Sequence, residues 1–482
     1  MNKRVIIYIL GWVLIIEGIA MQIGTVTSLV YGENEGFYFL STGAVCCLLG
    51  TLAVKVKKPK NMVLYQKAGF VATALSWVVM SLMGCLPFWL SREIPSFIDA
   101  LFETVSGFTT TGSSILNDVE ELSHCMLIWR SFIIWLGGMG VIVFLLAIIP
   151  KLGGQQNIHL MKAESPGPIV AKAVPHMKKY AMILYSIYIG LTVIEFILLL
   201  CGGMGFFDAI TTSFSTAGTG GFGIRNANIG AYNSYYLQTV IAVFMLLFGI
   251  NFNFYILLIV RKFKSAFKLE ELWLYLSIIV LSVVIITFNI CSLYPTFYEA
   301  FHQSFFYVSS IITTTGFGIG DVNHWPQLSK AVILIITFVG AMAGSTGGGF
   351  KISRVLILFK KIRKEFSILI HPRNIKTVKL DGKTVDHTII RNTSMFLVLY
   401  IGVFAISFLL ISIENKDFIT TFTSVAASMN NTGPGLGEVG PIGNYSAFSN
   451  FSKGVFIFDM FAGRLEFFPF LLMFSPSAWK KA

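Results

Sequence analysis

Apolar stretches long enough to cross a membrane follow one another along the whole chain, and they constrain the fold more than any other feature. The first two extend from Val5 to Leu29 and from Phe37 to Val54. A helix of about 20 apolar residues crosses the ~30 Å hydrocarbon core of a bilayer. Charged residues make up 12% of the chain, whereas soluble proteins contain about 25%. The sequence therefore predicts an all-α polytopic membrane protein.

The first apolar stretch begins after Lys3 and Arg4, as the apolar core of a secretory signal peptide would. It is longer than such a core, and a second apolar stretch follows closely, so we interpret it as an uncleaved first span. The six cysteines lie mostly in or beside apolar stretches and show no CxxC spacing. This pattern predicts neither a zinc site nor a disulfide framework.

The distribution of basic residues predicts the orientation in the membrane. The net charge of +12 could by itself indicate nucleic-acid binding. The basic residues, however, gather in certain loops, while connections such as YGENEG (residues 31–36) are acidic or neutral. Loops rich in lysine and arginine lie in the cytoplasm. We therefore expect no nucleic-acid partner, a cytoplasmic N-terminus, and cytoplasmic segments at residues 55–60, 162–179, 261–268 and 354–391.

Three apolar stretches lie between the first two basic segments: Ala68–Leu90, Ile94–Phe108 and Leu127–Ile149. Because basic segments flank this unit on both sides, the chain must cross the membrane an even number of times within it. The middle stretch is also too short to span a bilayer. We therefore predict a span, a half-helix that enters from outside, and a second span. The polar TTTGSS (residues 109–114) would return the chain outward.

The same order of span, half-helix and span occurs three more times, with a period of about 100 residues. The later units comprise Met182–Cys201, Phe206–Ala217 and Tyr236–Val260; Leu272–Ile290, Tyr298–Ile312 and Ala331–Leu358; and Met395–Ile413, Phe418–Met429 and Val455–Phe474. The expected fold has about ten spans and pseudo-fourfold symmetry. Its parts are an N-terminal helix pair (1–60) and four pore repeats (61–160, 161–265, 266–375 and 376–482).

A polar segment with a glycine follows each half-helix: SGFTTTGSS (106–114), TAGTGGFGI (216–224), SIITTTGFG (310–318) and SMNNTGPGL (428–436). Aligning Asp99 with Asp208 at the starts of the first two half-helices pairs Gly112 with Gly221. Gly218 and Gly220 are rivals, but GGF in the second segment matches TGF in the third and favours Gly221. The equivalent glycines of the third and fourth segments are Gly316 and Gly433.

Four such segments around one axis would suit a monovalent cation. Glycine permits positive φ angles, which would turn carbonyl oxygens toward the axis, and a ring of carbonyls can replace the hydration shell of the ion. Mg²⁺ and Ca²⁺ would call for charged ligands, which the segments lack. The expected filter consists of Thr110, Thr111, Gly112, Thr219, Gly220, Gly221, Thr314, Thr315, Gly316, Asn431, Thr432 and Gly433. The ion would bind at Thr111, Gly112, Gly220, Gly221, Thr315, Gly316, Thr432 and Gly433.

The half-helices would add to this field, because a helix C-terminus pointing at the pore centre presents partial negative charge. Acidic residues stand at or near the outer, N-terminal ends: Asp99, Asp208, Glu299 and Asp417. They are either ordinary helix caps or attractors for incoming cations.

On these four segments, together with AGSTGGGFK (343–351) and LIHPRNIKTVKLDGKTV (369–385), the chain resembles the TrkH/TrkG potassium-uptake family. That family belongs to a wider superfamily with KtrB and the plant high-affinity potassium transporters. The resemblance extends from about Met1 to Lys480, and the N-terminal helix pair is more like TrkH than KtrB.

The resemblance implies a gated, channel-like potassium pore in the bacterial inner membrane. It implies K⁺ as the transported and bound ion, no covalent cofactor, a homodimer in the lipid bilayer, and regulation by a cytosolic TrkA-type nucleotide-binding ring. In that superfamily a serine in place of the first filter glycine accompanies sodium permeation. All four glycines are present here, which favours potassium.

The segment AGSTGGGFK interrupts the second span of the third unit. Each glycine weakens a helix by about 1 kcal/mol relative to alanine, so we expect a broken helix. One interpretation is an intramembrane gate beneath the filter; the other is close helix packing through small residues. It is not a phosphate loop, because Phe350 breaks the GxxxxGK spacing. The expected gate consists of Gly344, Ser345, Thr346, Gly347, Gly348, Gly349, Lys351 and Arg464.

Two arginines fall within predicted spans. The resemblance implies that Arg464 lies below the filter as an electrostatic barrier to cations; the alternative is an ion pair with Glu466 or Asp459. Arg130 lies near the outer end of its span, where we expect it to reach water. The basic segment Lys360–Arg391 could bind anionic lipid or the regulatory ring, or form a solvated linker.

The predicted function is uptake of K⁺ down its electrochemical gradient. The closest alternative is a K⁺/H⁺ or K⁺/Na⁺ symporter on the same scaffold, although the filter segments contain no Asp, Glu or His. We do not expect an enzyme, because the spans contain neither HExxH nor convergent aspartates. A sensory or scaffolding subunit would leave the four matched glycines unexplained.

Overall fold

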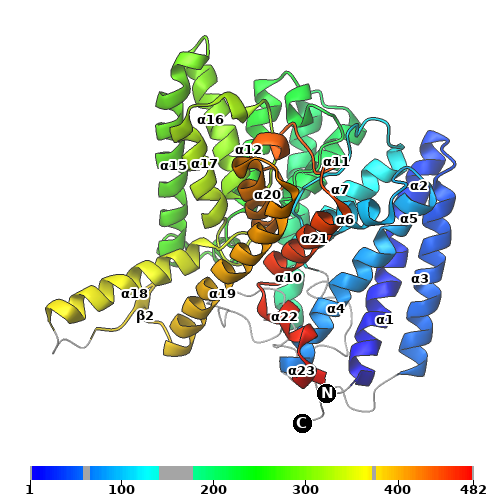
Figure 1. Cartoon of the computed structure of the whole chain (residues 1–482), viewed down its shortest axis with the longest axis horizontal. Helices are drawn as coiled ribbons and strands as arrows, with labels where there is room; N and C mark the ends of the chain where they lie inside the picture. The colour runs from blue at the N-terminus through cyan, green and yellow to red at the C-terminus, as the bar shows by residue number, and fades with distance from the viewer. Residues whose placement is uncertain (1–2, 58–65, 141–176, 372–375, 480–482) are drawn as a thin grey trace.

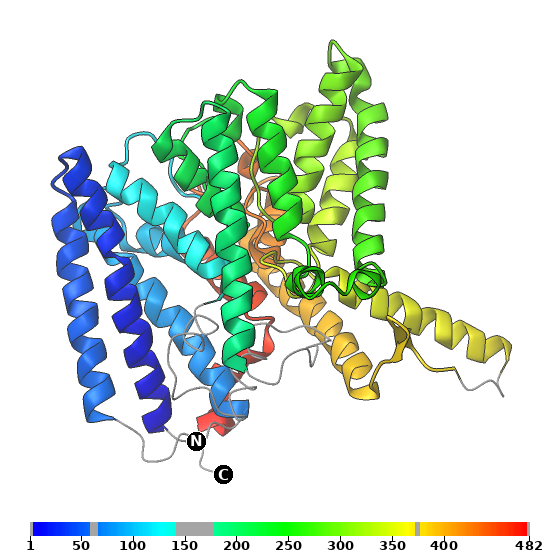
Figure 2. The ribbon, with the colours of Figure 1, turned by 180° about the vertical axis from the view of Figure 1, so that it is seen from behind.

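A computed structural model describes residues 3–57, 66–140, 177–371 and 376–479. Helices α1 (Lys3–Ala20), α2 (Gln22–Tyr31) and α3 (Gly36–Val56) form the predicted N-terminal pair, in which α1 and α2 make one span. Figures 1 and 2 show this pair at one edge of the molecule. Glycines bring α1 and α3 close together: a Cβ on Gly18 would lie 2.6 Å from the carbonyl oxygen of Gly43. Small residues allow such close packing of membrane helices.

Six predicted spans are continuous apolar helices of sufficient length. Besides the N-terminal pair, they are the first spans of the four units. These comprise α4 (Gln66–Gly84) with α5 (Leu86–Leu90), then α10 (Met177–Cys201), α15 (Glu270–Ile290) and α19 (His387–Ile411). The polytopic all-α membrane fold is thereby confirmed.

The four predicted half-helices are also confirmed. They are α6 (Phe97–Phe108), α11 (Phe206–Ala217), α16 (Phe297–Ile312) and α20 (Phe418–Asn430). Of the four acids at their outer ends, Asp417 is itself an N-cap and accepts a hydrogen bond from the backbone N–H of Thr420. Ser96 and Thr296 cap α6 and α16 instead. Asp99 forms an ion pair with Lys453, and Asp208 with Arg225.

The second spans of the last three units are interrupted, and that of the first unit is described only as far as residue 140. The segments are α7 (His124–Gly138); α12 (Tyr235–Phe248) and α13 (Phe252–Ile259); α17 (Gln327–Val339) and α18 (Ile352–Ile370); and α21 (Asn450–Arg464) and α22 (Phe468–Phe474). The break in 343–351 confirms the prediction. The expectation of continuous helices over Tyr236–Val260 and Val455–Phe474 was wrong. The part of Leu127–Ile149 after residue 140 lies outside the described residues.

Each unexpected break has a local cause. Between α12 and α13 the chain bends by 87°. There, the backbone N–H of Phe252 donates to the carbonyl of Gly344, and Asn251 caps the new helix. Between α21 and α22, Glu466 and Phe467 both have positive φ angles, 54° and 62°. A contact between units at one break and two positive φ angles at the other thus end helices that apolar composition alone would continue.

Short elements connect these helices. They are η3 (Asn228–Ala231), α14 (Phe263–Ala266), η4 (Cys291–Leu293), η5 (Val322–His324), η6 (Ser412–Glu414), η7 (Gly437–Val439) and α23 (Pro476–Trp479). Strands β1 (Lys379–Leu380) and β2 (Lys383–Thr384) form an antiparallel hairpin in which Lys379 pairs with Thr384. Figure 1 shows α18 extending away from the other helices. Residues 58–60 and 162–176 of the predicted basic segments lie outside the described residues.

Candidate functional site

All four half-helices end in the same turn. In α6, the N–H of Thr111 donates to the carbonyl of Ser106 (2.8 Å), and the N–H of Thr110 donates to that of Gly107 (3.0 Å). This pair of bonds defines a Schellman motif. The equivalent pairs are Gly220 to Ser215 and Thr219 to Thr216; Thr315 to Ser310 and Thr314 to Ile311; and Thr432 to Ala427 and Asn431 to Ser428.

Each motif places a non-glycine residue in the left-handed region. The residues and φ angles are Thr110 (57°), Thr219 (53°), Thr314 (56°) and Asn431 (54°). A positive φ is rare for a β-branched residue, and such outliers persist only where the surrounding structure imposes them. Three threonines and one asparagine at equivalent positions therefore mark four turns held in one geometry.

The predicted glycines follow two residues later, and all four have positive φ. The angles are 82° at Gly112, 65° at Gly221, 84° at Gly316 and 91° at Gly433. The rival Gly218 has a φ of −76° and caps α11. The sequence register that pairs Gly112 with Gly221 is therefore confirmed.

The four glycines lie in a closed ring. A Cβ on Gly112 would lie 2.0 Å from the carbonyl oxygen of Gly220 in the second segment. A Cβ built on the glycine of the second segment likewise meets a carbonyl oxygen of the third segment. The third segment meets the fourth in the same way, and the fourth meets the first. These contacts are Gly221 with the oxygen of Thr315 (2.1 Å), Gly316 with that of Thr432 (2.2 Å), and Gly433 with that of Thr111 (2.6 Å). Each segment therefore contacts the next, and none of these four glycines has room for a side chain.

The carbonyls of this ring differ in their hydrogen bonding. Those of the residue before each glycine (Thr111, Gly220, Thr315 and Thr432) accept no hydrogen bond from any side chain or peptide in the described parts of the chain. By contrast, the carbonyl of Gly433 accepts from Ser113 (3.1 Å) and Tyr445 (3.0 Å). That of Gly221 accepts from Asn228 (3.3 Å). The two sets of carbonyls therefore differ, since only those of Gly221 and Gly433 are held by hydrogen bonds among the described residues.

Side-chain hydroxyl and amide groups stabilise the turns through hydrogen bonds. Thr109 and Thr111 share a hydrogen bond between their side chains (2.8 Å), as do Thr313 and Thr315 (2.8 Å). The side-chain amide of Asn431 donates to Thr111 Oγ1 (2.8 Å), which joins the fourth segment to the first.

Among the described residues, no group of three His, Cys, Asp or Glu side chains could hold a metal ion.

The glycine-rich break between α17 and α18 lies against the ends of two half-helices. The N–H of Gly348 donates to Thr314 Oγ1 (2.6 Å), and that of Gly349 to the carbonyl of Asn430 (2.9 Å). A Cβ on Gly348 would lie 2.4 Å from that same carbonyl oxygen. The predicted gate segment therefore contacts the predicted filter directly.

Arg464, at the end of α21, contacts both the break between α17 and α18 and the end of α7. Its guanidinium donates to the carbonyls of Thr346 (2.9 Å), Gly137 (2.5 Å) and Gly138 (3.0 Å). The two acids considered as its ion-pair partners have other contacts. Glu466 forms salt bridges with Lys351 (3.4 Å) and Arg354, and Asp459 accepts a hydrogen bond from Ser407 (2.6 Å).

One buried ion pair was missed by sequence reasoning. We expected Arg130 to reach water, and this was wrong, because Arg130 is 1% exposed and bound to Glu103, which is 0% exposed. The acid that shields it comes from α6, the half-helix before the first filter segment. The sequence did offer a signal for this ion pair, because Glu103 and Arg130 are charged residues of opposite sign in two neighbouring apolar segments.

The whole chain can be compared with known proteins. The TrkH family, described as "Cation transport protein", matches residues 35–481. The Trk system potassium uptake proteins TrkH of Salmonella typhimurium and Escherichia coli are each 35% identical over 100% of both chains. The potassium uptake protein TrkG of Escherichia coli is 33% identical over 99% of both chains.

A solved structure has the same fold. The potassium transporter TrkH from Vibrio parahaemolyticus superposes with a TM-score of 0.88 and 30% identity, and the match covers 100% of both chains. Family, full-length relatives and fold agree. The chain belongs to the TrkH family of cation transport proteins.

Proposed function

We propose that this protein takes up potassium ions through a pore whose selectivity filter is the ring of four glycine segments. The observation that carries the proposal is the closed ring of contacts from Gly112 through Gly221 and Gly316 to Gly433. Full-length relatives are potassium uptake proteins, and the ring supplies a physical basis for the same function here.

The ring suits a monovalent cation for three reasons. The carbonyl oxygens of Thr111, Gly220, Thr315 and Thr432 would replace the water around a dehydrated ion. The C-terminal ends of four half-helices, each with partial negative charge, meet at the same place. The filter segments contain no carboxylate, which would hold the ion too strongly to release it. Transport on this scheme involves no covalent step.

The intramembrane segment and Arg464 would close the path on the cytoplasmic side of the ring. A guanidinium at this depth opposes the passage of cations. Arg464 also ties Thr346 to Gly137 and Gly138, so release of these carbonyls would free the segment to move. The glycines at 347–349 supply the flexible backbone for that motion.

The topology follows from the same scheme. An inner-membrane location with the N-terminus in the cytoplasm places the half-helices on the outer side, where they receive external K⁺. The N-terminal pair and four pore repeats would form the five structural parts of each protomer. A homodimer with a cytosolic nucleotide-binding ring on its basic face would regulate the gate, since α18 carries Lys360, Lys361, Arg363 and Lys364.

Uptake of ⁸⁶Rb⁺ into cells that lack their own potassium transport tests the proposal. The native protein should restore uptake, and Gly221→Ser and Gly316→Ser should impair it or its selectivity over Na⁺. Unaltered flux and selectivity in both variants would sink the filter assignment.

The alternative of a coupled symporter is tested separately in proteoliposomes. If current reverses at the K⁺ equilibrium potential whatever the H⁺ and Na⁺ gradients, the transport is uncoupled. A reversal potential that shifts with either gradient would establish coupling on the same scaffold.

A further inference from the structure

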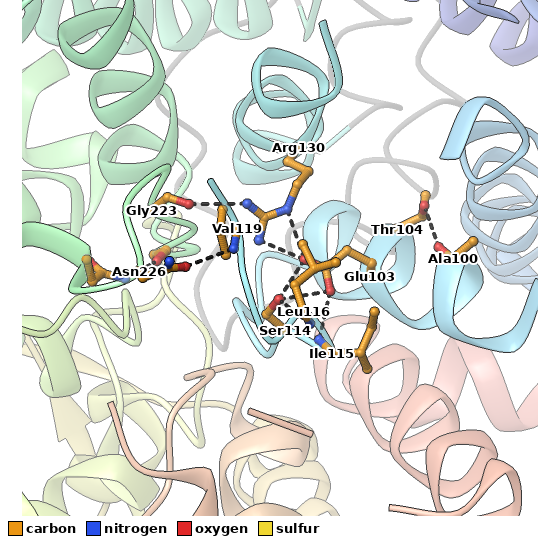
Figure 3. Close-up of polar contacts among 12 residues, drawn as sticks. Ala100, Glu103, Thr104, Ser114, Ile115, Leu116, Val119, Arg130, Gly223 and Asn226 are labelled. Atoms are coloured by element: carbon orange, nitrogen blue, oxygen red, sulfur yellow. Dashed lines mark hydrogen bonds and ion pairs between the residues drawn. The ribbon is translucent and has the colours of Figure 1, made fainter. Parts of the chain in front are cut away.

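The buried pair of Glu103 and Arg130 lies directly behind the junction of the first two filter segments. Figure 3 shows the Arg130 guanidinium between the Glu103 carboxylate and the carbonyl of Gly223. Arg130 donates to Glu103 Oε1 through Nε (2.9 Å) and Nη2 (2.7 Å), and to Gly223 through Nη1 (3.2 Å). Its guanidinium also lies 4.2 Å from the centre of the Phe222 ring.

Glu103 completes the connection on the other side. It accepts from Ser114 Oγ (3.0 Å) and from the backbone N–H of Ile115 (3.0 Å). Ser114 and Ile115 follow Gly112 by two and three residues, while Phe222 and Gly223 follow Gly221 by one and two. The pair therefore joins equivalent positions of two neighbouring segments just outside the ring.

This arrangement is particular to the first unit. The residue nine positions before each filter glycine is Glu103, Thr212, Tyr307 or Ser424. Tyr307 makes such a contact only within its own unit and without charge, because its hydroxyl accepts from the N–H of Gly320 (2.9 Å). Ser424 instead bonds within its own helix, to the carbonyl of Thr421 (2.9 Å). Only the first of these four positions carries a carboxylate.

We propose that Glu103 and Arg130 are positioning residues that set the ion preference of the filter. The pair is neutral as a whole, so it adds no net charge behind the ring, and it fixes the spacing of the first two segments. Removing either partner alone leaves an unpaired buried charge, and the two unpaired charges have opposite signs. This inference rests on the proposed filter function.

Opposite charges should produce opposite effects. In Glu103→Gln the remaining Arg130 repels cations, so the KM for Rb⁺ uptake should rise by about tenfold or more. In Arg130→Gln the remaining Glu103 attracts cations, so KM should not rise, but Na⁺ should compete more strongly. The double variant Glu103→Gln/Arg130→Gln has no unpaired charge, and its KM should return to within a few-fold of the native value.

Two further variants separate positioning from folding. Arg130→Lys keeps the charge but cannot reproduce the planar fork of contacts, so KM should stay near native while discrimination against Na⁺ falls. Asn226→Ala is the matched control: it breaks an exposed link between the same two segments, the bond from the N–H of Val119 to Asn226 Oδ1 (2.8 Å). It should change neither KM nor selectivity.

The decisive measurement is concentration-dependent ⁸⁶Rb⁺ uptake with Na⁺ as competitor, scaled to folded protein in the membrane. Unchanged KM and Na⁺ competition in Glu103→Gln, Arg130→Gln and Arg130→Lys would overturn the inference. So would a double variant no better than the worse single variant, because a purely structural role predicts that result. Gly316→Ala in the same assay tests the proposed function separately: if Gly316→Ala is impaired and the pair variants are not, only this inference fails.

Discussion

Alanine at a filter glycine tests the closed ring more sharply than any other substitution. At Gly316 the added Cβ would lie 2.2 Å from the carbonyl oxygen of Thr432, whereas such contacts are ordinary from 3.4 Å. The neighbouring segment would have to move by more than 1 Å, and the atom in the way belongs to the backbone. The residue also has a φ of 84°, which costs a side chain about 1–2 kcal/mol.

The chain offers a control that separates these two costs. Gly203 has the same φ of 84°, but a Cβ there would meet nothing within 4 Å. Gly203→Ala therefore carries only the free-energy cost of a side chain at positive φ. Its flux should stay near native when it is scaled to the amount of folded protein. Gly316→Ala adds the collision, and each further 1.4 kcal/mol reduces the population of the intact ring about tenfold. We expect its ⁸⁶Rb⁺ uptake to fall by at least about tenfold.

The four ring positions should also differ among themselves. The collision distances are 2.0 Å at Gly112, 2.1 Å at Gly221 and 2.2 Å at Gly316, but 2.6 Å at Gly433. Alanine at Gly433 should therefore be the least damaging of the four. Uptake by the Gly112, Gly221 and Gly316 variants equal to that of Gly203→Ala would refute the ring geometry.

Three further predictions follow from single contacts. Arg464→Ala removes the hydrogen bonds to Thr346, Gly137 and Gly138. Basal ⁸⁶Rb⁺ flux without a regulatory partner should therefore rise several-fold in proteoliposomes. A flux at or below native would contradict the proposed role of Arg464 in the gate. Tyr445→Phe removes one of two donors to the Gly433 carbonyl, at a cost of about 1 kcal/mol, and should weaken Na⁺ rejection in competition assays while expression stays native. Asp417→Ala removes the α20 cap and should lower stability by about 1 kcal/mol in thermal melts. Hydrogen bonds from Thr420 hold the pKa of Asp417 below its usual range, so the melting difference should be present at neutral pH and vanish as pH falls through that lowered pKa; a difference that persists in acid would exclude the cap.

Much of the architecture could be predicted because charge placement and apolar length are properties of the sequence itself. The half-helix Phe206–Ala217 has its predicted bounds, and the register of Gly221 follows from the acid that precedes it. These features depend on local composition and on the bilayer, both of which are known before any contact is made.

Other features depend on contacts that no local pattern reports. The 87° bend after Phe248 arises where Asn251 and Gly344 meet across two units. Arg130 looks exposed in the sequence because its span position is near the outer end, and only the fold brings Glu103 to it. The positive φ of Thr110 was likewise not expected, since threonine disfavours that conformation and the ring imposes it.

The ring itself can be observed with a heavy monovalent cation. Anomalous diffraction from crystals grown with Rb⁺ or Tl⁺ would locate the ion without reference to transport rates. We predict a peak coordinated by the carbonyl oxygens of Thr111, Gly220, Thr315 and Thr432, which is lost in Gly316→Ala and retained in Gly203→Ala. A crystal of the native protein with ordered filter segments and no peak among these four oxygens would contradict the central claim.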